Sequence, residues 1–504
     1  MPVRSRHRTD PRVRPRTGAA HERSGRRGRR DRTARSRVRT PRADQRRLRA
    51  ARRSAHRPGR HARARRRDLP LARGLARRAL RPAGARAHHD GAASRGERQV
   101  PHRPAERAAM KPGSEPLRAR FPALRTSPPP IYLDNAATTQ KPDTVIEAVR
   151  EALESAGAVS RAVHPLGHAA TERYEAARER VAEHLGVPPH EIVFTRNTTA
   201  AIHLVACGWP ADGAVVASRA EHHANLLPWR ERLLPLAPRP DGRFDVDALR
   251  EQLQRERVSL VALQHASNVT GLGTDLDAVV DLAHRHGAVV LLDAAQTAAH
   301  RPLEVERLGV DLLTFSGHKM YGPEGVGVLW GRTEVLERIR PVQIGGGTVH
   351  AVSETLEPAW REVPWRFEAG TPDVAAAAGL AAALDLLEDL GFDAIAAHER
   401  ALVAQLHSQL ERRVPQLRFA VPHDPDSCGP VSFWVPGLSP HTLAKALGDA
   451  AGICVRSGYH CAEPLHRALE LPPTLRVSVG VYNTSVEIER FVDTLAELLQ
   501  LHGL

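Results

Sequence analysis

Lysine is rare in this chain of 504 residues, although Lys and Arg together number 73. The four lysines are Lys111, Lys141, Lys319 and Lys445. A primary amine can react covalently with a carbonyl group and a guanidinium cannot, so a lysine kept in an Arg-rich chain suggests amine chemistry. Lys319 directly follows an apolar run, in the segment Ser316-Gly-His-Lys-Met-Tyr-Gly322. A loop that leaves a parallel strand lies where such sheets bind ligands. The simpler interpretation is a surface lysine in a turn.

A carboxylate stands in a comparable position. Asp293 ends the apolar run 288–293. A buried acid there needs a hydrogen bond or a cationic partner, because an unpaired buried charge is costly. A pyridinium nitrogen is one such partner: pyridoxal phosphate pairs its ring nitrogen with an Asp while a Lys holds its aldehyde. Taken alone, an acid in the position of Asp293 is more often a helix cap or a member of an ion pair.

A phosphate group would also need a binding site. The segment Arg196-Asn-Thr-Thr199 follows the apolar run 191–195 and precedes a helical pattern that begins near Ala200. The N–H groups at a helix start, together with hydroxyls, form an anion site. Ser316 and His318, beside Lys319, could add donors. The simpler interpretation of the segment is a threonine N-cap.

The chain has four cysteines, without the spacing of a disulfide framework, which indicates reduced thiols in a reducing compartment. Cys207 and Cys454 have apolar neighbours and are predicted to lie in the core. Cys428, in a loop with Pro and Asp, is ambiguous. Cys461 lies between an Arg and a His on one side and Pro464 on the other, and such neighbours favour the reactive thiolate. A nucleophile is therefore preferred to a zinc ligand, since no second Cys/His pair with ligand spacing is present. An inert loop thiol ranks between these two interpretations.

Short apolar runs that alternate with amphipathic stretches must position these side chains. The predicted strands are 191–195, 214–218, 260–265, 288–293, 312–316 and 325–330. They are rich in Val and Leu without strict alternation, which is typical of a sheet covered on both faces. Helices alternate with them; one is 171–185, which precedes the first strand and which Gly186 ends. This rhythm predicts an α/β fold with a mostly parallel sheet between helices.

The C-terminal part has a different pattern. A long helix over 375–390 leads to another helix and then to β-like runs at 431–435, 453–455 and 474–479. The last helix begins with the capping box Thr484-Ser-Val-Glu487. We expect a large α/β domain over 128–388, with an N-terminal arm at 128–147. A smaller α+β domain over 389–504 would carry Cys461.

Residues 1–109 differ from the rest. They hold 36 Arg, no Lys and 8 acidic residues, so that a net charge of +28 there and −12 in the remainder gives the total of +16. They contain no Phe, Tyr or Trp and are predicted to be disordered, because such a chain cannot bury enough apolar surface. We favour a misassigned start upstream of Met110 over a basic tail or a targeting segment. The negative body argues against a nucleic-acid binder. No apolar run has the length of a membrane span, so we expect a soluble, cytoplasmic protein with no membrane partner.

Seven segments in combination then resemble a known family. They are Tyr132-Leu-Asp-Asn-Ala-Ala, Glu221-His-His-Ala-Asn225, Ser267-Asn268, Asp293-Ala-Ala-Gln296, Ser316-Gly-His-Lys319, Phe367-Glu-Ala-Gly-Thr-Pro372 and Arg456-Ser-Gly-Tyr-His-Cys461. From about Pro128 to Leu504 the chain resembles the class V, fold-type I pyridoxal-phosphate enzymes. More narrowly, it is similar to the Suf-type (group II) cysteine desulfurases, which have a short segment around the catalytic Cys.

The resemblance implies a role for each matching residue. Lys319 would bind the aldehyde of pyridoxal 5'-phosphate, and Asp293 would pair with its ring nitrogen. The other implied cofactor contacts are Gln296 at the ring hydroxyl, His222 stacked on the ring, Thr199, Ser316 and His318 at the phosphate, and Thr371 reaching the phosphate from the second subunit of a homodimer. His222 would also be catalytic, by assisting proton transfer. Arg476, with Asn268, would bind the substrate carboxylate. Cys461 would accept sulfur.

The implied reaction converts L-cysteine to L-alanine and leaves a persulfide on Cys461. A sulfur-acceptor protein of the Suf type would then take the sulfur for iron–sulfur cluster assembly. Two departures bear on the acceptor and on substrate preference: Tyr459 precedes His460 where the family commonly has a second His, and 160–164 lacks a frequent His-Arg-Gly pattern. A selenocysteine lyase or another class V aminotransferase-type enzyme is the alternative.

Overall fold

The computed structural model describes residues 110–160, 162–427 and 429–501. The predictions made for 1–109, Arg161 and Cys428 lie outside the described residues. All described residues belong to one compact unit.

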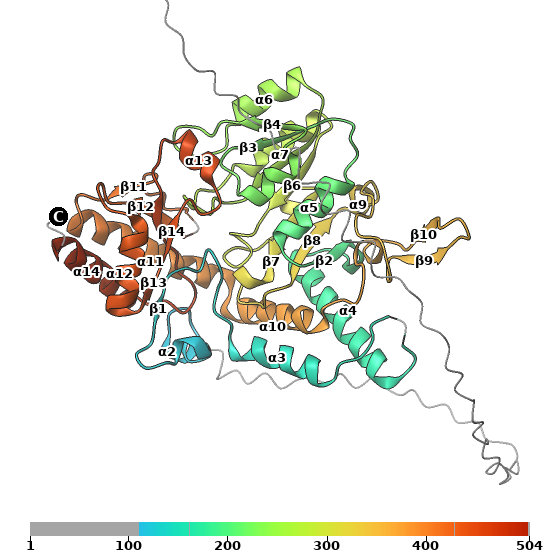
Figure 1. Cartoon of the computed structure of the whole chain (residues 1–504), viewed down its shortest axis with the longest axis horizontal. Coiled ribbons are helices and arrows are strands. Elements are labelled where there is room, and N and C mark those ends of the chain that lie inside the picture. Colours follow the sequence, from blue (N-terminus) through green and yellow to red (C-terminus); the bar gives the residue numbers. More distant parts are fainter. Residues whose placement is uncertain (1–109, 161, 428, 502–504) are drawn as a thin grey trace, which may run out of the picture. The chain divides into compact units, whose positions relative to one another are not determined.

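A seven-stranded sheet organises the larger part of this unit (Figure 1). Its strands, in spatial order, are β2 (Ile192–Thr195), β8 (Gly327–Gly331), β7 (Leu312–Ser316), β6 (Val289–Asp293), β5 (Val258–Gln264), β3 (Ala214–Ser218) and β4 (Leu233–Leu236). Strand β8 is antiparallel to β2 and β7, and the other neighbours are parallel. The predicted α/β class and mostly parallel sheet are confirmed. Strand β4, which contains Pro235 and lies at the edge of the sheet, was not predicted.

Both faces of this sheet are buried, which explains the continuous apolar runs. Neighbouring residues such as Leu260 and Val261 belong to two different hydrophobic cores, and both are fully buried. The core around Val261 includes side chains of α4 (Pro165–Leu185), α6 (Val246–Arg255), α7 (Leu276–Arg285) and α10 (Val374–Leu390). The opposite core includes side chains of α5 (Thr198–Gly208) and α9 (Thr333–Leu336). Helix α10 packs against α4 and α3 (Asp143–Glu154), as Figure 1 shows.

The C-terminal part is built on a separate antiparallel sheet with the order β11, β12, β15, β14. These strands are Arg418–Phe419, Val431–Trp434, Thr474–Val477 and Arg456–Gly458, and the accompanying helices are α11 (Phe392–Arg413), α12 (Pro440–Ala451), α13 (Glu463–Ala468) and α14 (Ser485–Leu501). The predicted capping box is present: the Thr484 N–H donates to Glu487 Oε2 at 3.0 Å, and the Glu487 N–H donates to Thr484 Oγ1 at 3.3 Å.

The beginning and the end of the described chain are joined in this part. Strand β1 (Ile131–Tyr132) pairs in parallel with β13 (Ile453–Cys454). Beyond it, Asn135 Nδ2 donates to the Ser478 carbonyl at 2.8 Å. The N-terminal arm is therefore held by residues near the C-terminus.

The folded body starts upstream of the predicted boundary at residue 128. Helix α2 (Glu115–Arg118) and the 3-10 turn Pro122–Leu124 bury Leu117, Phe121 and Leu124 in the main core. The Phe121 ring packs edge-on against Tyr482, with centroids 4.7 Å apart, and contacts Tyr321. This segment thus supports the loop that carries Lys319.

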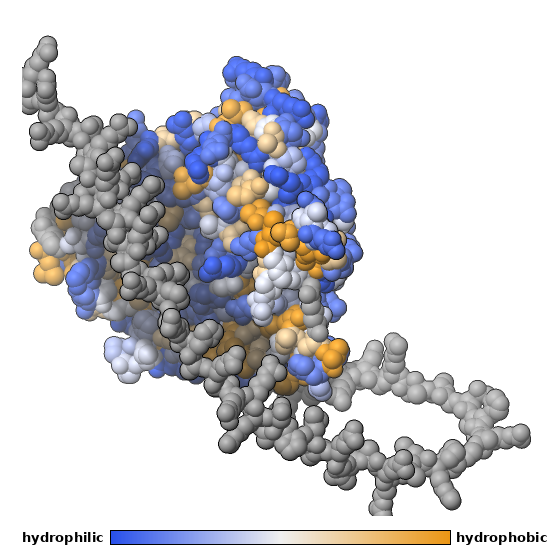
Figure 2. Space-filling model, turned by 45° about the vertical axis from the view of Figure 1, so that its right-hand side comes forward, coloured by the Kyte–Doolittle hydropathy of each residue, from blue (hydrophilic) through white to orange (hydrophobic). Residues whose placement is uncertain are grey.

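The remaining elements lie at the surface. They are α8 (Val305–Leu308) and the antiparallel pair β9 (Val349–Val352) and β10 (Pro358–Trp360). Figure 2 shows a mostly hydrophilic face with hydrophobic residues in separate groups. None of the helices within the described ranges is long and apolar enough to cross a bilayer.

Candidate active site

A cavity of about 210 Å³ lies where strands of the large sheet end and the C-terminal part meets them. Strand β6 ends at Asp293, β7 ends at Ser316, and His222 follows β3. The other side of the cavity is lined by Arg456, Cys461 and Arg476, which are more than 130 residues away in sequence from Lys319. The parallel strands thus bring their carboxyl ends to one place, as the sequence predicted.

Ten of the eleven predicted site residues line this cavity: Lys319, Cys461, His222, Asp293, Gln296, Thr199, Ser316, His318, Arg476 and Asn268. Thr371 does not. It is exposed and lines a second cavity, which also touches Thr199. Its predicted contact from a second subunit stays a prediction.

Lys319 and Asp293 each alter the pKa of the other. Burial lowers the pKa of Lys319 to about 8, although the nearby Asp293 opposes this shift. Burial raises the pKa of Asp293 above its usual range, and the N–H of Ala295, donating to Asp293 Oδ1 at 3.0 Å, opposes that shift. A buried carboxylate with this limited support suits a cationic ring nitrogen.

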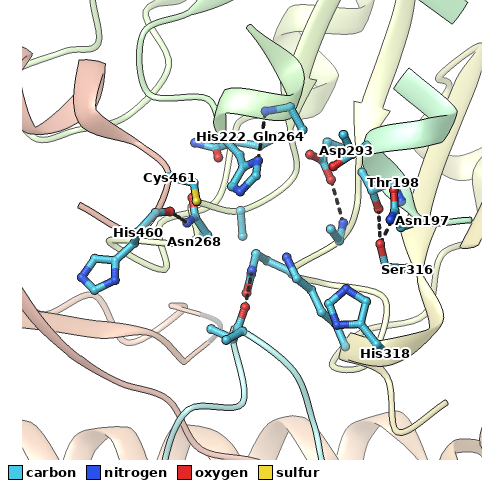
Figure 3. Close-up of a pocket in the computed structure, with 18 of the residues that line it drawn as sticks. Asn197, Thr198, His222, Gln264, Asn268, Asp293, Ser316, His318, His460 and Cys461 are labelled. Atoms are coloured by element: carbon cyan, nitrogen blue, oxygen red, sulfur yellow. Dashed lines mark hydrogen bonds between the residues drawn. The ribbon is translucent and has the colours of Figure 1, made fainter. Parts of the chain in front are cut away.

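His222 presents a neutral ring to the cavity (Figure 3). Burial, with the nearby Lys319, lowers its pKa to about 4. Its Nδ1 accepts a hydrogen bond from the Ala224 N–H at 3.1 Å, so the ring proton is on Nε2. This tautomer offers a donor at the far end of the ring.

The start of α5 forms the other end of the cavity. Asn197 is the N-cap, and its Oδ1 accepts from the Ala200 N–H at 2.9 Å, so the cap is not a threonine. The Thr198 N–H donates to Ser316 Oγ at 2.9 Å. Thr199, the next helical residue, lines the cavity. This helix start beside Ser316 is suited to an anion such as a phosphate.

Arg476 is almost fully buried at the opposite end, on β15. Its Nη1 donates to the Asn268 carbonyl at 2.9 Å, and its Nη2 pairs with Asp134 Oδ1 at 3.2 Å. Arg476 Nε and Asn268 Oδ1 have no hydrogen-bond partner among the described residues. Burial lowers the pKa of Arg476 to about 10, which leaves it cationic at neutral pH. Two unpaired buried polar atoms on the cavity wall indicate a polar ligand.

Cys461 is exposed, on the loop between β14 and α13. In Figure 3 its thiol lies on the other side of the pocket from Ser316 and Thr198. Both His460 and Cys461 have left-handed backbones, with φ of 53° and 58°. Such residues store strain of order 1–3 kcal/mol each, which the surrounding contacts must balance. The loop is therefore held in an unusual conformation at the reactive side chain.

The structure adds Gln264 and Arg456, which were not predicted as site residues, to the cavity wall. Asn197 and Thr198, from the segment predicted to bind an anion, line the cavity as well. Arg456 was noted only as a neighbour of Cys461, and its Nη1 lies 3.7 Å from Asp134 Oδ2. Asp134 also pairs with Arg476. The positions of these residues in the sequence do not show that Asp134 contacts both arginines.

The prediction for Cys207 is wrong, because its side chain is exposed. Helix α5 buries Ala201, Ile202 and Val205, whereas Cys207 lies with His203 on its outer side, 3.5 Å from His203 Nε2. The apolar neighbours in sequence belong to a different face of the helix. Cys454 is half-buried rather than in the core.

Residues 131–491 match the family described as aminotransferase class-V. The chain belongs to this family. Among curated class V relatives, a probable cysteine desulfurase of Halalkalibacterium halodurans is 38% identical over 405 residues, which are 77% of this chain and 98% of that protein. A cysteine desulfurase of Klebsiella pneumoniae is 40% identical over 408 residues, covering 77% of this chain and 99% of that protein.

Solved structures of cysteine desulfurases are similar to this chain in fold as well as in sequence. The apo cysteine desulfurase of Thermococcus onnurineus has a TM-score of 0.72 at 36% identity, covering 78% of this chain and 99% of that one. The cysteine desulfurase CsdA (S-sulfonic acid) of Escherichia coli has a TM-score of 0.70 at 38% identity, covering 77% and 98%. The predicted fold-type I architecture is confirmed.

Proposed function

We propose that this class V enzyme is a pyridoxal-phosphate-dependent cysteine desulfurase, which converts L-cysteine to L-alanine and accepts the sulfur on Cys461. One observation supports this most directly: an exposed thiol and a half-buried lysine, from segments far apart in the sequence, line one small cavity. The relatives named above are described as cysteine desulfurases and are about 40% identical to this chain.

The residues present fit the cofactor. Lys319 would hold its aldehyde carbon, Asp293 its ring nitrogen and Gln296 its ring hydroxyl, while His222 would cover the ring. Ser316, His318 and Thr199 would bind the phosphate at the start of α5. When bound, pyridoxal phosphate supplies an electron sink for the substrate. The unpaired Arg476 Nε and Asn268 Oδ1 are the groups that would receive the substrate's carboxylate and amine region.

Three side chains of the protein would each carry out a different part of the reaction. Arg476 orients the substrate by its carboxylate, since a guanidinium can bind one through two parallel hydrogen bonds. With a pKa near 8, the Lys319 amine is partly unprotonated at neutral pH and can take the proton from the substrate's Cα. Cys461 Sγ attacks the substrate sulfur: an S–S bond forms, the C–S bond breaks, and its electron pair stays on the substrate. The substrate then takes up two protons and leaves as L-alanine: Cβ gains the proton that the Cys461 thiol lost, and the Lys319 ammonium returns the proton to Cα.

Several finer assignments rest on the sequence resemblance and are proposals too. We propose membership of the Suf-type subgroup, a sulfur-acceptor protein of that type serving iron–sulfur cluster assembly, and a cytoplasmic homodimer in which Thr371 completes the partner's phosphate site. The exposed position of Thr371 is compatible with this last role. We also propose the division into 128–388 and 389–504.

A Cys461→Ser variant tests the proposed function. It should bind the cofactor with an unchanged visible spectrum but form no alanine or sulfide from L-cysteine, because the hydroxyl cannot accept sulfur. Cys207→Ser is the matched control, since that thiol is also exposed and should be dispensable. Persistence of cysteine turnover in Cys461→Ser would contradict the desulfurase proposal and favour a thiol-independent reaction, such as that of a selenocysteine lyase or an aminotransferase.

A further inference from the structure

The segment Glu221–Asn225 contains two consecutive histidines, and the reaction above uses only the first. His222 lines the site cavity, whereas the second, His223, lines an adjoining surface groove with Cys461. The two rings are 6.3 Å apart, between centroids. His223 therefore has a position of its own beside the nucleophile.

His223 contacts the Cys461 loop twice. Its backbone N–H donates to the Cys461 carbonyl at 2.8 Å. Its ring Nε2 accepts from the Glu463 N–H at 3.3 Å. The two contacts are made to Cys461 and to Glu463, two residues further on. His223 of the large domain therefore binds the loop at two points.

The second contact replaces a missing helix cap. Glu463 is the first residue of α13, and the N–H groups of a first helical turn need acceptors from outside the helix. The N-cap position is Ala462, whose side chain has no acceptor and makes no capping hydrogen bond. The His223 ring supplies an acceptor for the N–H of the first helical residue, which has no partner inside the helix.

The loop needs such restraint because it is strained. His460 and Cys461 both have positive φ. On the other side of the thiol, Asn268 Nδ2 donates to the His460 carbonyl at 2.6 Å. Removing the His223 ring would leave the loop held upstream of Cys461 but free to relax at the start of α13.

We propose that His223 is a positioning residue, which holds the Cys461 thiol in its attacking position by capping α13 and binding the Cys461 carbonyl. This inference rests on the proposed function for its kinetic consequence, but the restraint itself does not. His222, whose ring would face the cofactor, and His223, which restrains the Cys461 loop, are neighbours in the same turn. Misplacing a reacting group by about 1 Å can cost roughly a hundredfold in rate.

The test compares substitutions at His223 in the cofactor-loaded enzyme. His223→Ala removes the ring acceptor, His223→Gln places an amide oxygen near the position of Nε2, and His223→Asn is too short to reach it. His190→Ala is a control, because that exposed ring bonds Thr333 and lines neither cavity. Three quantities are measured: the cofactor spectrum, hydrogen exchange of the backbone over residues 459–469, and kcat and KM for L-cysteine.

We expect an unchanged spectrum in every variant. Exchange at 459–469, including the Glu463 amide, should rise roughly tenfold in His223→Ala and His223→Asn, because local opening becomes easier. The kcat value should fall roughly ten- to a hundredfold in both with little change in KM, and His223→Gln should restore both quantities.

Unchanged exchange in His223→Ala would overturn the proposed restraint. Faster exchange with an unchanged kcat would overturn its role in the reaction. If His223→Gln behaves like His223→Ala, the acceptor role is wrong. If the unaltered enzyme forms no alanine from cysteine, the proposed function fails, while the exchange experiment still decides whether His223 holds the loop.

Discussion

Lys319 lies between influences of opposite sign, and this fixes how its amine should respond to pH. Burial and the nearby Arg476 and Arg456 favour the neutral amine, whereas Asp293 favours the ammonium. The net effect is a pKa lowered to about 8. The neutral, reactive form therefore predominates above about pH 8, where an exposed lysine would still be protonated.

The first prediction concerns this amine. In cofactor-free enzyme, the rate of covalent pyridoxal-phosphate uptake should rise with pH and level off above about 8, since the neutral amine is the nucleophile. Stopped-flow absorbance measures the rate. Lys319→Arg should show no covalent uptake, and Lys445→Arg, at an exposed ion pair with Asp449, should behave as the unaltered chain does. A rate that keeps rising to pH 10 would show that Lys319 titrates normally.

At the scale of elements, the phosphate end depends on a close approach of two backbones. Gly327 on β8 has no room for a side chain: a Cβ there would lie 2.6 Å from Asn197 Cα and 2.8 Å from the Phe315 carbonyl oxygen. The absent side chain lets β8 lie directly against the start of α5. The helix position that would bind phosphate is thus set by the neighbouring strand.

Gly327→Ala should accordingly displace the start of α5. We expect roughly tenfold weaker cofactor binding and a loss of about 1–3 kcal/mol in the free energy of unfolding, as for other overpacked sites. Fluorescence titration and urea unfolding measure these. Gly345→Ala is the matched control, because its Cβ would meet no atom within 4 Å. Equal behaviour of the two variants would refute this account.

A buried ion pair holds the segment that carries Thr371. Glu368 Oε1 lies 2.7 Å from Arg178 Nη1 and also accepts from the Phe194 N–H at 2.7 Å. The Tyr174 hydroxyl donates to Glu368 Oε2 at 2.9 Å. One carboxylate therefore ties α4 and β2 to the segment three residues before Thr371.

Removing this carboxylate should be costly. Glu368→Ala removes one of the two acidic partners of the nearly fully buried Arg178, which would keep its ion pair with the partly exposed Glu175. We expect the free energy of unfolding to fall by about 3 kcal/mol. Glu179→Ala, at an exposed position on the same helix, should change it by less than about 0.5 kcal/mol. Urea unfolding decides, and a similar small change in both variants would show that the network adds little stability.

These elements show how far the sequence could go. Apolar runs predicted β3 and β7 with their observed bounds, and they placed Asp293 and Lys319 correctly, because the carboxyl ends of parallel strands share an edge. The sequence could not show that Ala462 leaves a helix uncapped until His223 caps it. Nor could it show that Gly327 underlies Asn197. Such contacts join segments far apart in the chain, and no local pattern records them.

At the scale of the whole molecule, the segment just after Met110 belongs to the body. Leu117 and Phe121 are fully buried, and Met110 packs against the same core. A chain that begins at Met110 should keep the kcat of the full-length protein.

A chain that begins at Pro128 should have a free energy of unfolding lower by several kcal/mol, because it exposes the core that these apolar side chains cover. Thermal unfolding and cysteine turnover test both, and an equally stable shorter chain would show that α2 is dispensable.

The pairing of β1 with β13 has a consequence for biosynthesis. The partners of the N-terminal arm are among the last residues made: Asn135 and its partner Ser478 are separated by 343 positions. On the ribosome, strand β6, which ends at Asp293, and strand β7, which precedes Lys319, can assemble first. Until the C-terminal part has been made, Ile131 and Leu133 of the arm remain unburied. Arg476 and Cys461 also emerge late. The nascent enzyme should therefore bring Lys319 and Asp293 together before the arm completes the cavity and before it can position either substrate or sulfur.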